Sequence, residues 1–236
     1  MLEAALDAIR GHRWERIVVF TGAGVSADSG IPTFRGAGGL WRNFRSEDLA
    51  TPQAFSRDPA LVWEWYEWRR GLVRAAEPNA AHRAIAELDR AAVVTQNVDG
   101  LHARAGSRDV IELHGSLFRV RCTREHTVRE ALEPFGEIPP RCECGALLRP
   151  DVVWFGEMLP AGALERAARL IAEAELLLIV GTSGVVQPAA GLVSLCHGTS
   201  IEINPEASAL ASNCDFAIAA RAAEAVPAIV GALLEE

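Results

Sequence analysis

Five short apolar runs, separated by helical patterns, restrict the fold of this chain more than any other feature. The runs occupy residues 16–20, 92–95, 110–113, 176–180 and 200–203. They are mostly apolar without alternation, as in strands that are buried on both faces of a parallel sheet. Helical periodicity fills residues 80–89, 162–174 and 222–234. This alternation predicts an α/β fold with a doubly wound, Rossmann-like parallel sheet, whose ligands bind at the carboxyl ends of the strands.

Two segments interrupt the alternation. Residues 36–76 are rich in tryptophan and arginine and are expected to form a loop followed by helices, and residues 119–149 hold three of the five cysteines. We expect both insertions to pack together as a smaller second domain. The large domain is then predicted from the remaining segments, residues 1–35, 77–118 and 150–236.

Charge and composition exclude several kinds of partner. The net charge of -8 at pH 7 opposes binding to nucleic acid or to an anionic membrane surface. Glycine, proline and polar residues interrupt the longest uncharged stretch, residues 176–195, so it is not expected to span a membrane. The N-terminal residues carry acids and lack the apolar core of a secretory signal, and five cysteines do not suggest a disulfide framework. We expect a soluble, cytoplasmic protein with no nucleic-acid or membrane partner.

The turn after the first apolar run has the spacing of a dinucleotide-binding loop. Gly22 permits a tight turn, Gly24 lets backbone N–H groups approach a pyrophosphate, and Ala27 allows a helix to pack closely. A glycine-rich turn that is needed only for its backbone conformation has the same pattern. The following residues lack a second strand that ends in an acid, and Pro32 interrupts helix formation. Hydride transfer by a dehydrogenase is therefore disfavoured.

Polar or small residues follow the other four apolar runs as well. They are Gln96, Asn97 and Asp99; His114; Gly181, Thr182 and Ser183; and Asn204 with Glu206. A lone histidine is usually structural, but His114 at the ligand-binding edge of a parallel sheet is a candidate general base. Because the ends of parallel strands meet at one edge, these residues predict a single shared crevice.

The motifs, and their order along the chain, resemble those of the sirtuin family of NAD-dependent protein-lysine deacylases. They comprise residues 22–26 and 30–35, residues 95–102, residues 112–115, residues 148–157, and finally residues 181–183 with Asn204. The resemblance extends over nearly the whole chain. It implies a Rossmann-like fold, NAD as the cofactor, and acylated lysine side chains of proteins or peptides as substrates.

The resemblance also assigns roles to individual residues. It implies that NAD is held by Gly22, Ala23, Gly24, Ser26, Thr33, Phe34, Arg35, Gln96, Asn97, Asp99, Gly181, Thr182, Ser183, Asn204, Glu206 and Ala222. Asn97 and His114 are the implied catalytic residues, with His114 as general base on a ribose hydroxyl. The reaction would release nicotinamide and O-acyl-ADP-ribose. Val153, Phe155 and Gly156 are implied to bind the peptide as an added strand.

Acyl specificity is suggested by Tyr66 and Arg69, which share one face of a predicted helix. An arginine fork binds a carboxylate in bidentate fashion, and a phenol adds one donor. The alternative is ordinary packing beside a solvated charge. However, Tyr66 is the only tyrosine of the chain, and the pair resembles the Tyr-x-x-Arg pair of the desuccinylase and demalonylase branch. Residues 36–39 resemble the small-residue pocket wall of that branch. This predicts removal of succinyl and malonyl groups, with some deacetylation.

The cysteines raise the question of a metal. Sirtuins usually hold a structural zinc with two C-x2-C pairs, whereas here Glu125 takes the place of one cysteine and the second pair is tightened to Cys142 and Cys144. Together with Cys122, His126 could complete a set of four ligands. A metal-free remnant stabilised by packing is the alternative, and both remain open.

Two rival functions use the same motifs. A protein mono-ADP-ribosyltransferase would share Asn97 and His114, and a non-catalytic NAD-sensing module would share the cofactor contacts. The Tyr66 and Arg69 pair favours acyl-lysine as the substrate. Sensing alone needs no general base, so His114 disfavours the second rival.

Overall fold

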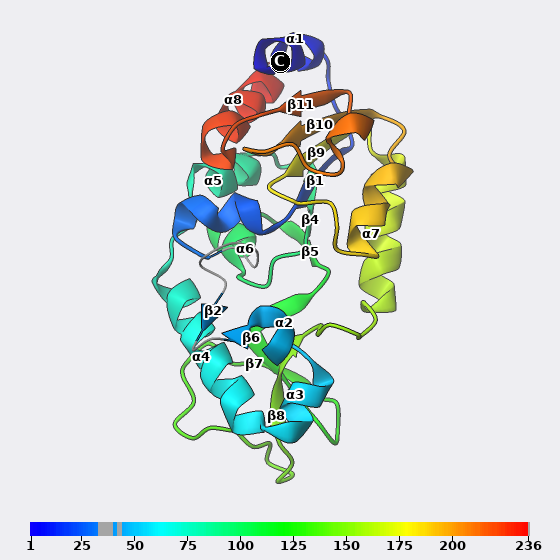
Figure 1. Cartoon of the computed structure of the whole chain (residues 1–236). Helices are drawn as coiled ribbons and strands as arrows, with labels where there is room; N and C mark the ends of the chain where they lie inside the picture. The colour runs from blue at the N-terminus through cyan, green and yellow to red at the C-terminus, as the bar shows by residue number, and fades with distance from the viewer. Residues whose placement is uncertain (33–39, 42–43, 236) are drawn as a thin grey trace.

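A computed structural model of the chain describes residues 1–32, 40–41 and 44–235. Its largest element is a six-stranded sheet of parallel strands in the order β11–β10–β9–β1–β4–β5 (Figure 1). The strands are β1 (Ile17–Thr21), β4 (Ala91–Thr95), β5 (Asp109–Glu112), β9 (Leu176–Val180), β10 (Thr199–Ile203) and β11 (Phe216–Ile218). The predicted doubly wound parallel sheet is therefore confirmed.

The order of the strands places a switch point in the middle of the sheet. The chain first builds outward from β1 to β4 and β5, and later returns to the opposite side of β1 with β9, β10 and β11. Thr21 is aligned with Val180, so the turns that follow β1 and β9 begin side by side. Ligands of open α/β sheets bind at such a switch point.

Helices cover both faces of this sheet (Figure 1). One face packs against α1 (Leu2–Ile9), α5 (Ala80–Glu87) and α8 (Ala222–Leu234). The other face packs against α7 (Ala161–Glu173) and the 3₁₀ helix η2 (Ala189–Leu195). Neighbouring residues of β1 divide between the two cores, because successive strand side chains point to opposite faces: Val19 joins the first core and Phe20 the second. This explains why the strands are apolar without alternation.

A smaller unit lies beyond the carboxyl end of β5 (Figure 1). It contains an antiparallel sheet in the order β7–β6–β8, formed by β7 (Val128–Glu130), β6 (Gly115–Cys122) and β8 (Leu148–Val152). The hairpin of β2 (Leu40–Trp41) and β3 (Phe44–Arg45) precedes the helices α2 (Ser46–Leu49), α3 (Pro52–Arg57) and α4 (Pro59–Ala75). The remaining short helices are η1 (Ala23–Ser29), α6 (Leu101–Ala105) and η3 (Ala211–Asn213).

Helix α4 is the main structural support of the small unit. Asp58 caps its start by accepting a hydrogen bond from the backbone N–H of Leu61 at 2.9 Å, and Pro59 occupies the first turn, where it removes no helical hydrogen bond. Trp63 and Trp65 project from α4 into a core that is separate from the two cores of the large sheet. Residues of both predicted insertions contribute side chains to this core.

The predicted limits of the small domain do not coincide with the ends of its strands. Strand β6 begins at Gly115 and β8 begins at Leu148, so both cross the predicted boundaries. The proposed division into two domains remains a prediction. Among the described helices, none combines the length and the apolar character needed to cross a membrane.

Candidate active site

The turns after β1 and β9 meet backbone to backbone at the switch point. Gly22 donates its N–H to the Val180 carbonyl at 3.0 Å, and Gly24 donates to the Gly181 carbonyl at 2.8 Å. A Cβ atom on Gly24 would lie 2.7 Å from the Gly181 Cα, so this contact requires glycine. The Gly24 N–H is thus used within the chain, in the contact between the two turns.

Asn97 and Asp99 lie over this platform, in a buried network with Ser26. The Asn97 amide nitrogen donates to the Gly22 carbonyl at 3.1 Å and to the Ser26 hydroxyl at 3.2 Å. Ser26 in turn donates to an Asp99 carboxylate oxygen at 2.8 Å, and burial raises the pKa of that carboxyl. Both hydrogen bonds use the side-chain nitrogen of Asn97 and fix the orientation of its amide group. The amide oxygen Oδ1 is therefore the atom through which Asn97 would accept a hydrogen bond from a ligand.

A second network joins the ends of β4, β9 and β10. Gln96 donates from its side-chain nitrogen to the Thr182 hydroxyl at 3.0 Å, and Asn204 donates to the Thr182 carbonyl at 2.8 Å. Ser183 and Glu206 are exposed outside this network, and Ala222 is the buried first residue of α8. The predicted cofactor residues Thr33, Phe34 and Arg35 lie outside the described residues, as does the 36–39 pocket wall.

His114 follows β5, and one hydrogen bond sets the tautomer of its imidazole ring. Its Nδ1 lies 2.8 Å from the Gln96 carbonyl oxygen. A carbonyl only accepts, so Nδ1 carries the hydrogen and Nε2 keeps its lone pair. Burial lowers the pKa of His114, which keeps the imidazole neutral at pH 7. The ring therefore has the tautomer that a general base at Nε2 requires.

The backbone next to His114 is as restricted as the switch point. Gly115 has φ +79°, and a Cβ atom there would lie 2.0 Å from the Asp151 carbonyl oxygen. Val153 donates its N–H to the His114 carbonyl at 2.9 Å. These contacts bring the predicted peptide-binding segment directly beside the candidate base.

Two histidines lie behind the network, and the sequence predicted a role for neither of them, although His102 ends the motif of residues 95–102. His102 Nε2 lies 3.0 Å from the Thr21 hydroxyl, His82 Nε2 lies 3.4 Å from the Ser26 hydroxyl, and the two rings are 4.8 Å apart. Burial lowers the pKa of His82 to about 4 and that of His102 to about 3. The available signal for His82 was a polar residue on the apolar face of a predicted helix.

Tyr66 and Arg69 are neighbours on α4, as their spacing predicts. Tyr66 is fully buried, whereas Arg69 is half-buried with its guanidinium 5.0 Å from the centre of the Trp65 ring. Burial lowers the pKa of Arg69, and the charges of Tyr66 and Asp99 oppose that change.

The predicted peptide-binding segment has most of its N–H groups in use. Val153 donates to His114, Phe155 donates to the Ala50 carbonyl at 2.9 Å, and Trp154 donates to a Glu157 carboxylate oxygen at 2.8 Å. A peptide added as a strand would have to pair with carbonyl groups of this segment or with the Gly156 N–H, because Glu157 donates its N–H to the Trp154 carbonyl at 2.9 Å. Phe155 is about half exposed at 47%.

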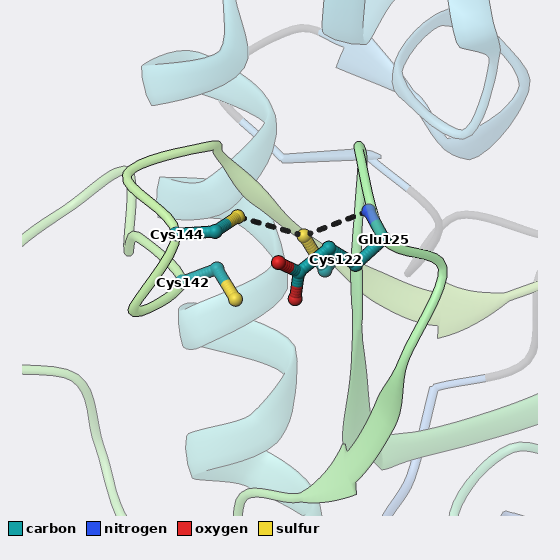
Figure 2. Close-up of side chains that lie close together, drawn as sticks. All are labelled: Cys122, Glu125, Cys142 and Cys144. Carbon is teal, nitrogen blue, oxygen red and sulfur yellow. Dashed lines mark hydrogen bonds between the residues drawn. The ribbon is translucent and has the colours of Figure 1, made fainter.

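Three of the five cysteines, Cys122, Cys142 and Cys144, lie close together with Glu125 in the small unit (Figure 2). The ligand atoms of Cys122, Glu125, Cys142 and Cys144 all lie within 4.8 Å of one another. The sulfurs of Cys122 and Cys144 are 3.5 Å apart, and the Glu125 N–H donates to the Cys122 sulfur at 3.3 Å. That hydrogen bond is the largest cause lowering the Cys122 pKa to about 7. Three thiols and a carboxylate are ligands that zinc accepts.

His126 is not a member of this cluster, which corrects the predicted ligand set. The chain turns back after Cys122, and His126 donates its N–H to the Cys122 carbonyl at 3.1 Å with φ 58°. This turn directs the side chain of Glu125 toward the sulfurs (Figure 2).

Comparison with known proteins gives consistent matches. The profile of the Sir2 family matches residues 22–188. An NAD-dependent protein deacylase 2 of Pyrobaculum aerophilum is 54% identical over 221 residues, covering 90% of this chain and 89% of that protein. The crystal structure of a Sir2 homolog–NAD complex has a TM-score of 0.91 and 49% identity, covering 98% of this chain and 93% of that one. A structure of Sir2 bound to acetylated peptide has a TM-score of 0.84 and 30% identity, covering 99% of each chain.

Proposed function

The chain belongs to the Sir2 family, the sirtuins, and on that premise we propose that it is an NAD-dependent protein-lysine deacylase. The observation that carries the proposal is the hydrogen bond between His114 Nδ1 and the Gln96 carbonyl. It leaves a basic Nε2 at the edge of a sheet whose switch point carries the nucleotide-binding motif. Among the solved structures that share this fold, one is a complex with NAD and another is bound to an acetylated peptide.

The described residues fit NAD at the switch point. Gly22, Ala23 and Gly24 would hold its pyrophosphate, and Asn97 and Asp99 would hold its nicotinamide end. When bound, NAD supplies the ADP-ribose that accepts the acyl group. Remaining parts of the cofactor would be held by Ser26, Gln96, Gly181, Thr182, Ser183, Asn204, Glu206 and Ala222, and by Thr33, Phe34 and Arg35.

Within this arrangement, His114 removes a proton from a ribose hydroxyl through Nε2. A positioned base of this kind typically contributes ~10²–10⁴-fold to the rate. Asn97 orients polar groups of the nicotinamide ribose through its Oδ1, because its nitrogen is fixed to the Gly22 carbonyl and Ser26. The rival assignments, mono-ADP-ribosyl transfer and NAD sensing, gain no support from the relatives, which are deacylases by name.

Acidic acyl groups are the proposed preferred substrates. Arg69 is half-buried, and its planar guanidinium has the geometry to bind a carboxylate through two hydrogen bonds. Tyr66 lies on the same face of α4 and adds a hydroxyl, and the side chains that surround it in the core of the small unit are largely apolar. A succinyl or malonyl chain carries the carboxylate that this pair recognises, and an acetyl group does not.

Structural zinc is proposed at the cysteine cluster, with Glu125 in the place of the fourth cysteine. The support is geometric, since three sulfurs and the carboxylate converge within 4.8 Å. The cluster lies in the small unit, away from His114, so the metal would stabilise the fold and take no part in the reaction.

The decisive test is a panel of acetyl-, succinyl- and malonyl-lysine peptides with and without NAD. We expect NAD-dependent deacylation with one nicotinamide released for each acyl group removed. Arg69→Met should lower kcat/KM for the succinyl peptide by roughly 10–150-fold, because a charge-assisted hydrogen bond is lost. The acetyl peptide serves as the internal control and should change little. Deacylation without NAD would contradict the activity, and equal losses on both peptides would contradict the acyl preference.

A further inference from the structure

Trp154 connects the two parts of the molecule that the substrate would contact. It lies in the proposed peptide-binding segment, yet its side chain is only 3% exposed and packs into the core of the small unit. Its indole Nε1 donates a hydrogen bond to the Tyr66 hydroxyl oxygen at 2.8 Å. One side chain thus joins the segment beside His114 to the acyl-pocket face of α4.

The direction of this hydrogen bond is chemically unambiguous. An indole N–H only donates, so the Tyr66 oxygen is the acceptor. The hydroxyl hydrogen of Tyr66 is therefore not used on Trp154 and remains available for another acceptor. Burial raises the pKa of Tyr66 to about 12, so the phenol keeps this hydrogen throughout the neutral range.

The Trp154 ring is held from several sides. The guanidinium carbon of Arg149 lies 3.5 Å from its ring centre, and the Phe55 ring lies at 5.2 Å. Arg149 is itself fixed by two hydrogen bonds to the Glu157 carboxylate, at 2.6 and 2.8 Å. One of those carboxylate oxygens also accepts the backbone N–H of Trp154 at 2.8 Å. The indole consequently has little freedom to turn away from Tyr66.

We propose that Trp154 is a positioning residue for acyl specificity, which holds the Tyr66 hydroxyl as a donor beside Arg69. This inference rests on the proposed preference for acidic acyl groups. Tyr66 has no exposed surface and Arg69 is half-buried, so of these two residues only Arg69 presents surface to the solvent. Arg149 and Glu157 belong to the same segment as Trp154 and fix its ring. Through its hydrogen bond to Tyr66, Trp154 therefore connects the proposed peptide-binding segment to α4.

The chain offers a matched control in Trp63. This tryptophan is fully buried in the same core, and its Nε1 also donates one hydrogen bond of 2.8 Å, but to the Leu148 carbonyl. Trp63→Phe and Trp154→Phe therefore remove the same atoms and one buried hydrogen bond each. Only Trp154→Phe removes a bond to the hydroxyl of Tyr66.

We expect Trp154→Phe to lower the ratio of succinyl to acetyl kcat/KM by about three- to tenfold, the usual contribution of one hydrogen bond. Trp63→Phe should lower stability while leaving this ratio unchanged. In a Tyr66→Phe background, the effect of Trp154→Phe on the ratio should disappear, because the group it positions is already absent. An unchanged ratio in Trp154→Phe, or an equal effect in both backgrounds, would overturn the inference.

A second measurement does not depend on the folding of Trp154→Phe. The Tyr66→Phe variant keeps the aromatic ring but removes the oxygen that accepts the Trp154 indole N–H. The indole N–H resonance that moves in the NMR spectrum of this variant is therefore assigned to Trp154. In the wild type, this resonance should shift when a succinyl-lysine peptide and NAD are added, and much less with the acetyl peptide. The same small shift with both peptides would refute the positioning role.

The same measurements distinguish a failure of the proposed acyl preference from a failure of the proposed role of Trp154. If the wild type removes acetyl but no succinyl groups, the acidic preference and the role of Trp154 fall together. If the wild type removes succinyl groups and Arg69→Met prevents this, but the Trp154→Phe ratio is unchanged, only the role of Trp154 falls.

Discussion

The edge of the parallel sheet and the small unit are built in different ways. At the edge, the turns after β1 and β9 are joined through backbone atoms, with Gly24 and Gly181 in contact. In the small unit, distant segments are joined through side chains. Examples are the bond from Trp154 to Tyr66, 88 residues away, and the convergence of Glu125 with three cysteines.

This difference has consequences for how each region responds to substitution. A backbone-built edge keeps its shape when a single side chain is replaced, provided that the glycines remain. The His114 side chain takes no part in the contacts between these two turns, so it can be replaced without altering them. In the small unit, each side chain positions another one, so a substitution there alters specificity or stability through its neighbours.

The largest expected effect tests the edge. His114→Ala should lower deacylation by ~10²-fold or more, because the general base is removed. NAD affinity should stay close to that of the wild type, since the backbone platform does not involve this side chain. Single-turnover kinetics and calorimetric titration with NAD measure the two quantities, with exposed His197→Ala as the control. A folded His114→Ala protein with nearly normal turnover would show that the base lies elsewhere.

A smaller effect concerns the pH dependence of stability at the same edge. The pKa of His82 is about 4 in the folded protein, against about 6.5 when unfolded. The unfolded state therefore binds more protons below pH 6.5, and stability is lost as the pH falls from there toward 4. At pH 5, His82 should account for a loss of roughly 2 kcal/mol relative to pH 7.

Urea unfolding at pH 7 and pH 5 measures this loss. His82→Gln should reduce the difference between the two pH values, whereas His197→Gln, at an exposed position, should not. His102 has its pKa lowered to about 3 and contributes in the same direction. Equal pH sensitivity in His82→Gln and the wild type would assign the effect to another region.

The smallest expected effect tests the small unit. Purified protein should hold about one zinc per chain, and Glu125→Gln should weaken binding because a charged ligand is lost. The resulting fall in Tm should be a few degrees, given roughly 2–4 °C for each kcal/mol in a chain of this size. Glu143→Gln, an exposed neighbour between two cysteines, is the matched control. Purified protein that holds no metal, together with an unchanged Tm in Glu125→Gln, would indicate that packing alone stabilises this part of the small unit.

Much of the parallel sheet could be predicted from the sequence. The five apolar runs became β1, β4, β5, β9 and β10 with small shifts at their ends. Local patterns suffice there because a strand buried on both faces must be apolar throughout. Strand β11 was not predicted, since Phe216–Ile218 is too short to show a pattern.

The sequence by itself determined the family, the order of the motifs and the residue types at the strand ends, because these depend on local spacing. Only the tertiary structure decided which atoms face one another. It gave His114 its tautomer through a carbonyl 18 residues away, turned the Gly24 amide toward Gly181, and placed Glu125 instead of His126 among the cysteines. A hydrogen bond depends on distance and direction within a few tenths of an ångström, and contacts between remote segments are set by how the elements pack.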